Sequence, residues 1–133
     1  MKWLKRTGAA LLALPIILIA IFVLYEIFGM FVNHIATRQQ TDQLQTNLEH
    51  EISDIKIISV YSETGNTSGP GNHVDCLSAI IFSTQMQELE IENSMSEYYE
   101  FNEWNCYVNK TDDGYYLFYL NTSAPFVNNI EGH

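Results

Sequence analysis

Residues 7–32 constrain this chain more than any other part of it. These 26 residues carry a single charged side chain, Glu26. As an α-helix the segment would extend about 39 Å, at about 1.5 Å per residue. The hydrocarbon core of a bilayer is only about 30 Å thick. We therefore predict a transmembrane anchor across residues 7–32, followed by one small domain.

The charges that flank this segment predict its orientation. Lys2, Lys5 and Arg6 precede it, whereas Arg38 is the one basic residue that follows closely. The positive-inside rule then places residues 1–6 in the cytoplasm and the domain outside the cell membrane, in a single-pass topology. A cleaved signal peptide is the alternative, but its apolar region would span about 7–15 residues and end in an A-x-A pattern. We therefore expect an uncleaved signal-anchor.

Two residues within the apolar segment are unusual for a membrane helix. Pro15 lacks a backbone donor, and we expect it to kink the helix. Glu26 could mark a relay or a partner contact, because ionisable groups inside membranes are commonly functional. It lies close to the outer end of the segment, so we expect its carboxylate to reach the level of the lipid headgroups instead.

The part of the chain after residue 32 is strongly acidic. Its 101 residues include three basic and fifteen acidic side chains, a formal charge of −12. This charge argues against nucleic acid and anionic lipid headgroups as partners. The expected partners are the membrane itself and another protein, and the oligomeric state stays open.

The pattern of residues beyond the anchor predicts an α+β fold with a mainly antiparallel sheet of about four strands and one or two helices. Residues 33–43 are polar on nearly every helical face, so we predict a juxtamembrane stalk there and the domain at residues 44–133. Leu44, Leu48 and Ile52 recur at helical spacing and predict a helix that docks on the domain and ends near residue 53.

The remaining elements follow from alternation and turn signals. Asp113-Gly114 is a strong hairpin signal, and Thr84 with Gln87 predicts a helix start. The predicted elements are a strand at 54–61, a loop at 62–72, a strand at 73–83, a helix at 84–100, strands at 104–110 and 115–121, and an irregular tail at 124–133.

The loop at residues 62–72 is a candidate binding loop. Glycines allow backbone N–H groups to converge on a phosphate or another oxyanion, and eleven residues are more than most strand connections need. The loop has neither the G-K-[ST] ending nor the G-x-G-x-x-G spacing of nucleotide sites, and an ordinary exposed loop is the alternative. The candidate residues are Gly65, Asn66, Thr67, Ser68, Gly69, Gly71 and His73.

No group of residues in the sequence indicates catalysis. His73 and Asp75 share a strand face, but Cys76 points to the opposite face. This breaks both a Cys–His nucleophile pair and a metal set. The other three histidines show no ligand spacing. We therefore expect no enzymatic activity, no catalytic residues, no metal and no cofactor.

Cys76 and Cys106 are the only cysteines, and we predict a disulfide between them if the domain lies outside the cell. Each falls within a predicted strand, on the face that carries apolar residues. Facing positions on adjacent antiparallel strands are close enough to bond. The alternative is two free thiols buried as small apolar groups.

The predicted function is that of a single-pass membrane-anchored protein with a small non-catalytic extracytoplasmic domain, in a binding or assembly role. A pilin-like structural subunit is an alternative. The layout resembles that family in its short basic leader ending in Gly8, its apolar helix that runs on into the domain, its antiparallel sheet and its late cysteine pair. The family's Phe-Thr-Leu-x-Glu start is absent, and Ala13 stands where its glutamate would fall. An extracytoplasmic hydrolase is a third, weaker alternative.

Overall fold

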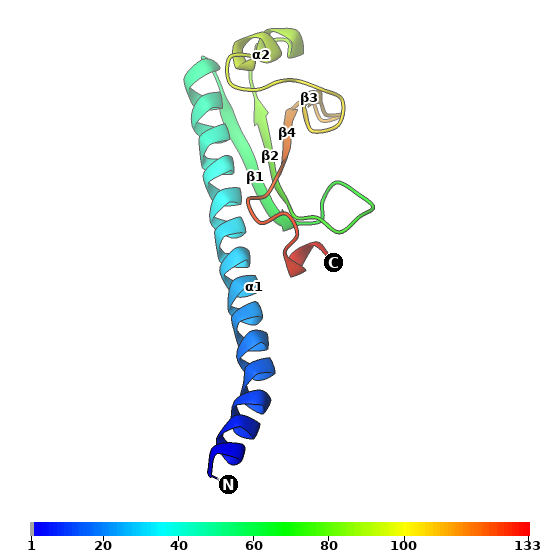
Figure 1. The fold of residues 1–133 in the computed structure, drawn as a ribbon. Helices are drawn as coiled ribbons and strands as arrows, with labels where there is room; N and C mark the ends of the chain where they lie inside the picture. Colours follow the sequence, from blue (N-terminus) through cyan, green and yellow to red (C-terminus); the bar gives the residue numbers. More distant parts are fainter. Residues whose placement is uncertain (1) are drawn as a thin grey trace.

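Helix α1 (Lys2–Glu51) runs through 50 residues without a break, a length of about 75 Å. The computed structural model describes the backbone of residues 2–133 and the side chains of residues 13–133. Figure 1 shows that the N-terminal half of α1 projects away from the domain, whereas the C-terminal half lies along the sheet. The most apolar part of the helix has a mean hydropathy of 2.4 and is almost wholly exposed. It is therefore compatible with a membrane anchor. Pro15 lies inside the helix without ending it.

The sheet has four antiparallel strands, and together with the helices it confirms the predicted α+β fold. Its order is β1-β2-β4-β3. The strands are β1 (Lys56–Gly65), β2 (Asp75–Ser83), β3 (Cys106–Lys110) and β4 (Tyr116–Ser123). The predicted hairpin joins β3 to β4, with Gly114 at a φ of +83° that favours glycine.

Helix α2 (Glu88–Met95) is shorter than the predicted helix at 84–100. The N-cap is Gln87, which forms a reciprocal capping box with Glu90. Thr84, the predicted cap, instead donates to the Asp54 carboxylate at 2.6 Å. A turn of 3₁₀ helix, η1 (Ile130–Gly132), lies within the predicted tail.

The core lies between α1 and the face of the sheet that α1 covers. Leu44, Leu48 and Ile52 are 0–1% exposed, as their helical spacing predicts. They pack in one cluster with Ile80, Phe82, Ile91, Met95, Cys106, Val108, Tyr116, Phe118 and Leu120. This burial removes apolar side chains of α1, the sheet and α2 from water together.

Residues 33–43, the predicted stalk, belong to α1 and pack against the sheet. Asn33, Thr37 and Thr41 recur every four residues, so they share one helical face, and all three are at most 5% exposed. Their polar character is explained by hydrogen bonds rather than by exposure to water. The domain therefore includes this segment.

Candidate functional site

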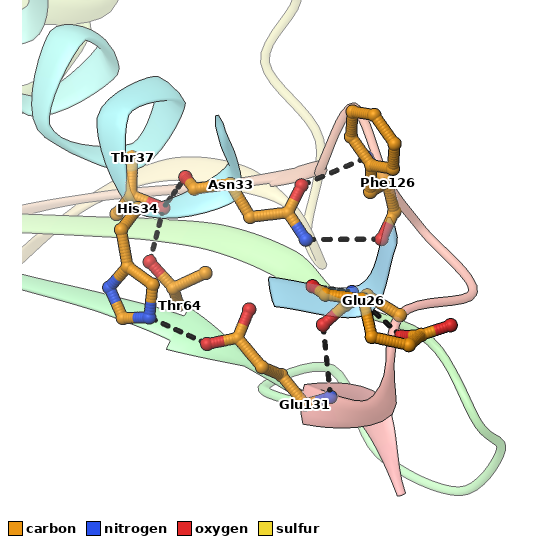
Figure 2. A network of polar contacts seen from close by, with 8 residues as sticks. Glu26, Asn33, His34, Thr37, Thr64, Phe126 and Glu131 are labelled. Atoms are coloured by element: carbon orange, nitrogen blue, oxygen red, sulfur yellow. Dashed lines mark hydrogen bonds and ion pairs between the residues drawn. The ribbon is translucent and has the colours of Figure 1, made fainter. Parts of the chain in front are cut away.

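Polar contacts join the middle of α1 to the C-terminal segment, residues 124–133, and we call this region the junction (Figure 2). Glu26 is the junction residue of α1 that lies nearest the N-terminus of the helix. Glu26 Oε2 accepts hydrogen bonds from the backbone N–H of Ile130 and from Asn129 Nδ2, each at 2.9 Å. The same Asn129 amide also donates to the Glu26 carbonyl at 2.8 Å. The one charge in the apolar segment thus has partners within the chain.

Asn33 forms the second contact of the junction. Its Nδ2 donates to the Phe126 carbonyl at 3.1 Å, and its Oδ1 accepts from the Phe126 N–H at 2.9 Å. Asn33 is fully buried, so both backbone groups of Phe126 are satisfied where water does not reach. The Phe126 ring packs edge-on against Tyr25 and Phe28, with centroids 5.6 and 5.8 Å apart. The C-terminal segment is therefore fixed to α1 by both polar and apolar contacts.

Gly29 makes this close approach feasible. A Cβ placed on Gly29 would lie 2.7 Å from Asn129 Nδ2 and 3.0 Å from the Phe126 ring. Both distances are shorter than a normal van der Waals contact. A glycine at this helical position is therefore a requirement of the junction geometry rather than of the helix backbone.

The junction continues toward the sheet through His34 and Thr37. His34 Nε2 lies 2.6 Å from Glu131 Oε1. Thr37 Oγ1 donates to the Asn33 carbonyl at 3.1 Å and lies 2.6 Å from Thr64 Oγ1, so Thr64 is the donor in that second bond. Figure 2 shows these side chains meeting between α1 and the end of β1.

Gln40 and Thr41 extend the polar contacts to the two central strands. Gln40 Nε2 donates to the Cys76 carbonyl at 2.8 Å and to Ser78 Oγ at 3.0 Å, and its carbonyl accepts from Thr122. Thr41 Oγ1 lies 2.7 Å from Ser78 Oγ. Matched buried groups of this kind fix how α1 sits on the sheet, because a shift would leave them unpaired.

One helical face links all these contacts. Residues 26, 29, 33, 37, 41, 44, 48 and 52 follow one another at steps of three or four, so they share one side of α1. The sequence predicted only the apolar end of this stripe, at residues 44, 48 and 52. The small polar residues at 33, 37 and 41 continue the same spacing, and this was the signal that could have predicted the junction.

The candidate binding loop lies at the same end of the domain as the C-terminal segment (Figure 1). Gly65 is the last residue of β1, so the loop proper begins at Asn66. Thr67 Oγ1 donates to Asn121 Oδ1 of β4 at 3.0 Å, and Asn66 Nδ2 donates to the Gly71 carbonyl. Gly69 and Gly71 both have a φ of +121°, a conformation that favours glycine. Ligand binding by this loop stays a prediction.

Ser68, His73 and Asp75 meet at the base of this loop. Ser68 Oγ lies 2.6 Å from both Asp75 Oδ2 and His73 Nε2, and His73 Nε2 is 3.2 Å from the same Asp75 oxygen. In a nucleophilic relay the imidazole contacts the acid and the hydroxyl through opposite nitrogens. Here the Ser68 hydroxyl and the Asp75 carboxylate both contact Nε2 of His73. The three side chains therefore hold the loop against the start of β2 rather than form a relay.

Cys76 and Cys106 are free thiols, so the predicted disulfide is wrong. Both face α1, but β4 lies between β2 and β3. Two strand spacings separate them laterally by about 10 Å, beyond the Cα separation that a disulfide tolerates. Burial raises the pKa of the Cys76 thiol and raises that of Cys106 to about 11. Both cysteines therefore act as small buried apolar groups.

A shallow cavity of about 380 Å³ lies beside β3, at the end of the domain away from the junction. Three carboxylates line it, those of Glu88, Glu92 and Glu103, together with Phe101 and Tyr107. Among the side chains that the structure describes, no three acidic, histidine or cysteine groups converge as a metal site would require. Comparison of the chain with protein-family models, with curated proteins and with solved structures gives no match.

Proposed function

We propose that this chain is a single-pass membrane protein that serves assembly rather than catalysis, as a subunit of pilin-like architecture with its domain outside the cell. One observation carries the proposal: a single 50-residue helix is half apolar projection and half domain core. A flexible tether would suffice for a receptor domain that only needs to stay at the membrane. A rigid helix shared by anchor and domain instead transmits the position of one to the other.

The exposed side of α1 at the C-terminal end of the apolar segment 7–32 supports an assembly role. Ile27 is 56% exposed and Phe31 is 65% exposed, on the side of the helix away from the sheet. They border a groove of about 420 Å³ whose other residues include Met30, Ile35 and Arg38. Contiguous exposed apolar surface of this kind is typical of a protein or membrane contact, and the cross-linking experiment below distinguishes the two. No ion pair to Arg38 occurs among the described residues.

The non-catalytic part of the proposal is supported by the loop geometry. Ser68 Oγ donates to Asp75 Oδ2, and His73 Nε2 contacts both this hydroxyl and the same carboxylate oxygen, so Asp75 does not orient the imidazole through its other nitrogen. In a Ser-His-Asp hydrolase the imidazole is the base, and the carboxylate that orients it lies at its other nitrogen.

Cysteine cross-linking in native membranes tests the assembly role. Ile27→Cys and Phe31→Cys, each in the full chain, should give disulfide-linked dimers after mild oxidation, because the two wild-type thiols are buried. Trp104→Cys is the matched control, since Trp104 is 79% exposed at the other end of the domain. Cross-linking at 27 and 31 that is no stronger than at 104 would contradict an assembly contact on this face.

Topology is tested separately. Protease added to intact cells or spheroplasts should remove an epitope placed after His133, and it should leave an N-terminal epitope intact. Protection of the C-terminal epitope would reverse the proposed orientation and would also remove the basis for an extracytoplasmic assembly role.

A further inference from the structure

The apolar segment of α1 is longer than a bilayer requires, so hydropathy alone leaves its depth undetermined. Residues 7–32 would extend about 39 Å as a helix, against a hydrocarbon core of about 30 Å. The difference of about 9 Å corresponds to about six residues. A feature outside the hydropathy pattern must therefore decide which residues lie within the lipid.

The C-terminal segment is fixed to α1 within this uncertain range. Asn129 and Ile130 bind Glu26, and Phe126 binds Asn33 and packs on Phe28. Most of the segment is irregular backbone, and irregular backbone exposed to lipid does not occur within the hydrocarbon region, because its N–H and C=O groups would lack partners. Wherever α1 sits, the residues bonded to this segment must stay outside the hydrocarbon.

We infer that Glu26 marks the level at which α1 leaves the hydrocarbon, and that residues 125–133 rest on the headgroup layer of the bilayer and set the depth of the helix. The inference rests on the proposed anchoring of α1 in a membrane. Counting about 20 residues back from Tyr25 ends at Arg6, so the three basic residues Lys2, Lys5 and Arg6 fall at the inner headgroup layer. Residues 27–32, although free of charge, then lie above the hydrocarbon.

The side chains at this level suit a lipid interface. Tyr25 and Phe28 are both more than half exposed, and they surround Phe126. Aromatic rings at the end of a span commonly lie at headgroup level. Ile130 is 57% exposed on the same part of the molecule, although an apolar side chain there gains nothing from water. Contact with the outer edge of the acyl chains would cover it.

The charge distribution of the domain agrees with a membrane-facing end. The loop that packs against the C-terminal segment has no charged residue from 64 to 74. Its contact with that segment is close, because a Cβ on Gly132 would lie 2.6 Å from the His73 backbone. The cluster of glutamates around α2 lies at the opposite end of the domain (Figure 1). The partner is therefore a zwitterionic lipid surface rather than an anionic one.

Fluorescence quenching by lipids tests this depth in the full chain reconstituted in phosphatidylcholine vesicles. A cysteine introduced at Leu18, Phe31, Trp104 or Ile130, one position at a time, would carry an environment-sensitive dye, because the two native thiols are buried. The lipids would carry a quencher either at the headgroup or deep in the acyl chain. We expect the deep quencher to act most strongly at 18 and the shallow one at 130. Neither should act strongly at 104, and the deep quencher should not act at 31.

Two results separate the inference from the proposed anchoring. Strong deep quenching at 31, similar to that at 18, would overturn the depth inference while keeping the membrane anchor. Absence of quenching at 18 would overturn the anchor itself. A dye at 130 that is as little quenched as the dye at 104 would also overturn the inference, because the C-terminal segment would then lie in water.

Weakening the junction should move the helix. Asn129→Ala removes both bonds from that side chain to Glu26, whereas Asn128→Ala changes an exposed neighbour for which the structure shows no hydrogen bond. With Asn129→Ala, we expect shallow quenching at position 31 to increase, because residues 26–32 move toward the hydrocarbon by up to one helical turn, about 5.4 Å. Asn128→Ala should leave the profile unchanged. Equal profiles for both variants would contradict a depth-setting role.

Discussion

Helix α1 meets the rest of the domain with two kinds of surface. From residue 44 to 52 it buries Leu44, Leu48 and Ile52 in an apolar cluster. From residue 26 to 41 the same side of the helix buries polar groups, of which Asn33 and Thr37 are the least exposed. One helical stripe therefore changes chemistry along its length while keeping its spacing.

The difference matters because apolar burial and hydrogen bonding have different effects on structure. Burial of Leu44 and its neighbours stabilises in proportion to area and tolerates small displacements. The bonds of Asn33 and Gln40 depend on distance and angle, so they specify one position of the helix on the domain. The polar half also lies next to the apolar projection, and its hydrogen-bonding groups distinguish this part of the stripe from the apolar residues that precede it.

Leu48→Ala should destabilise the domain more than any substitution in the polar half of the stripe. Leu48 is fully buried in the apolar half, and truncations of this kind cost about 2–5 kcal/mol. Denaturant unfolding of the full chain in micelles, followed by near-ultraviolet circular dichroism, would measure it. Leu89→Ala is the matched control, because Leu89 is 67% exposed and should change the unfolding free energy by less than about 0.5 kcal/mol.

Asn33→Leu should cost less, about 1–3 kcal/mol, because it leaves the N–H and C=O of Phe126 unpaired. The substitution keeps the size of the side chain, so the loss reports hydrogen bonding rather than a cavity. Asn128→Leu, at an exposed position, should be nearly neutral. If Asn33→Leu were neutral as well, the polar half of the stripe would not specify the position of the C-terminal segment on α1.

The sequence predicted the fold because its signals were local. The spacing of Leu44, Leu48 and Ile52, the alternation in the strands and the turn at Asp113-Gly114 each concern residues close in the chain. The sheet order could not be predicted in this way. The position of β4 between β2 and β3 separates Cys76 from Cys106, and nothing local to either cysteine indicates it.

The junction escaped prediction for a related reason. Its contacts join Glu26 to Asn129 and Asn33 to Phe126, more than ninety residues apart. The polar residues at 33, 37 and 41 were interpreted as exposed because polar residues usually are. Their regular step of four was the available sign that they belonged to the buried stripe.

Gly29→Ala should separate junction geometry from overall stability. The added methyl would lie 2.7 Å from Asn129 Nδ2, so we expect the C-terminal segment to detach while the rest of the domain stays folded. The gain in helix propensity, up to about 1 kcal/mol, partly offsets the lost contacts, so the unfolding midpoint should change little. Hydrogen exchange should instead show faster exchange at Ile130 than in the wild type. Unchanged exchange at Ile130 would contradict the tight packing at Gly29.

The smallest effect concerns Cys106 of β3, whose thiol packs in the apolar cluster with Leu44, Leu48 and Ile52. Burial raises its pKa to about 11, above the ordinary value of 9.0. The unfolded chain therefore loses this proton first as the pH rises, so the stability that the neutral thiol contributes is complete below pH 9 and disappears between pH 9 and 11. Tyr99 and Tyr119 also have raised pKa values because of burial, so the wild type alone cannot isolate the thiol. We expect Cys106→Ala to lower stability at about pH 8 but to give a shallower decline from pH 9 to 11. Parallel declines in the two proteins would show that Cys106 does not stay protonated in the folded core.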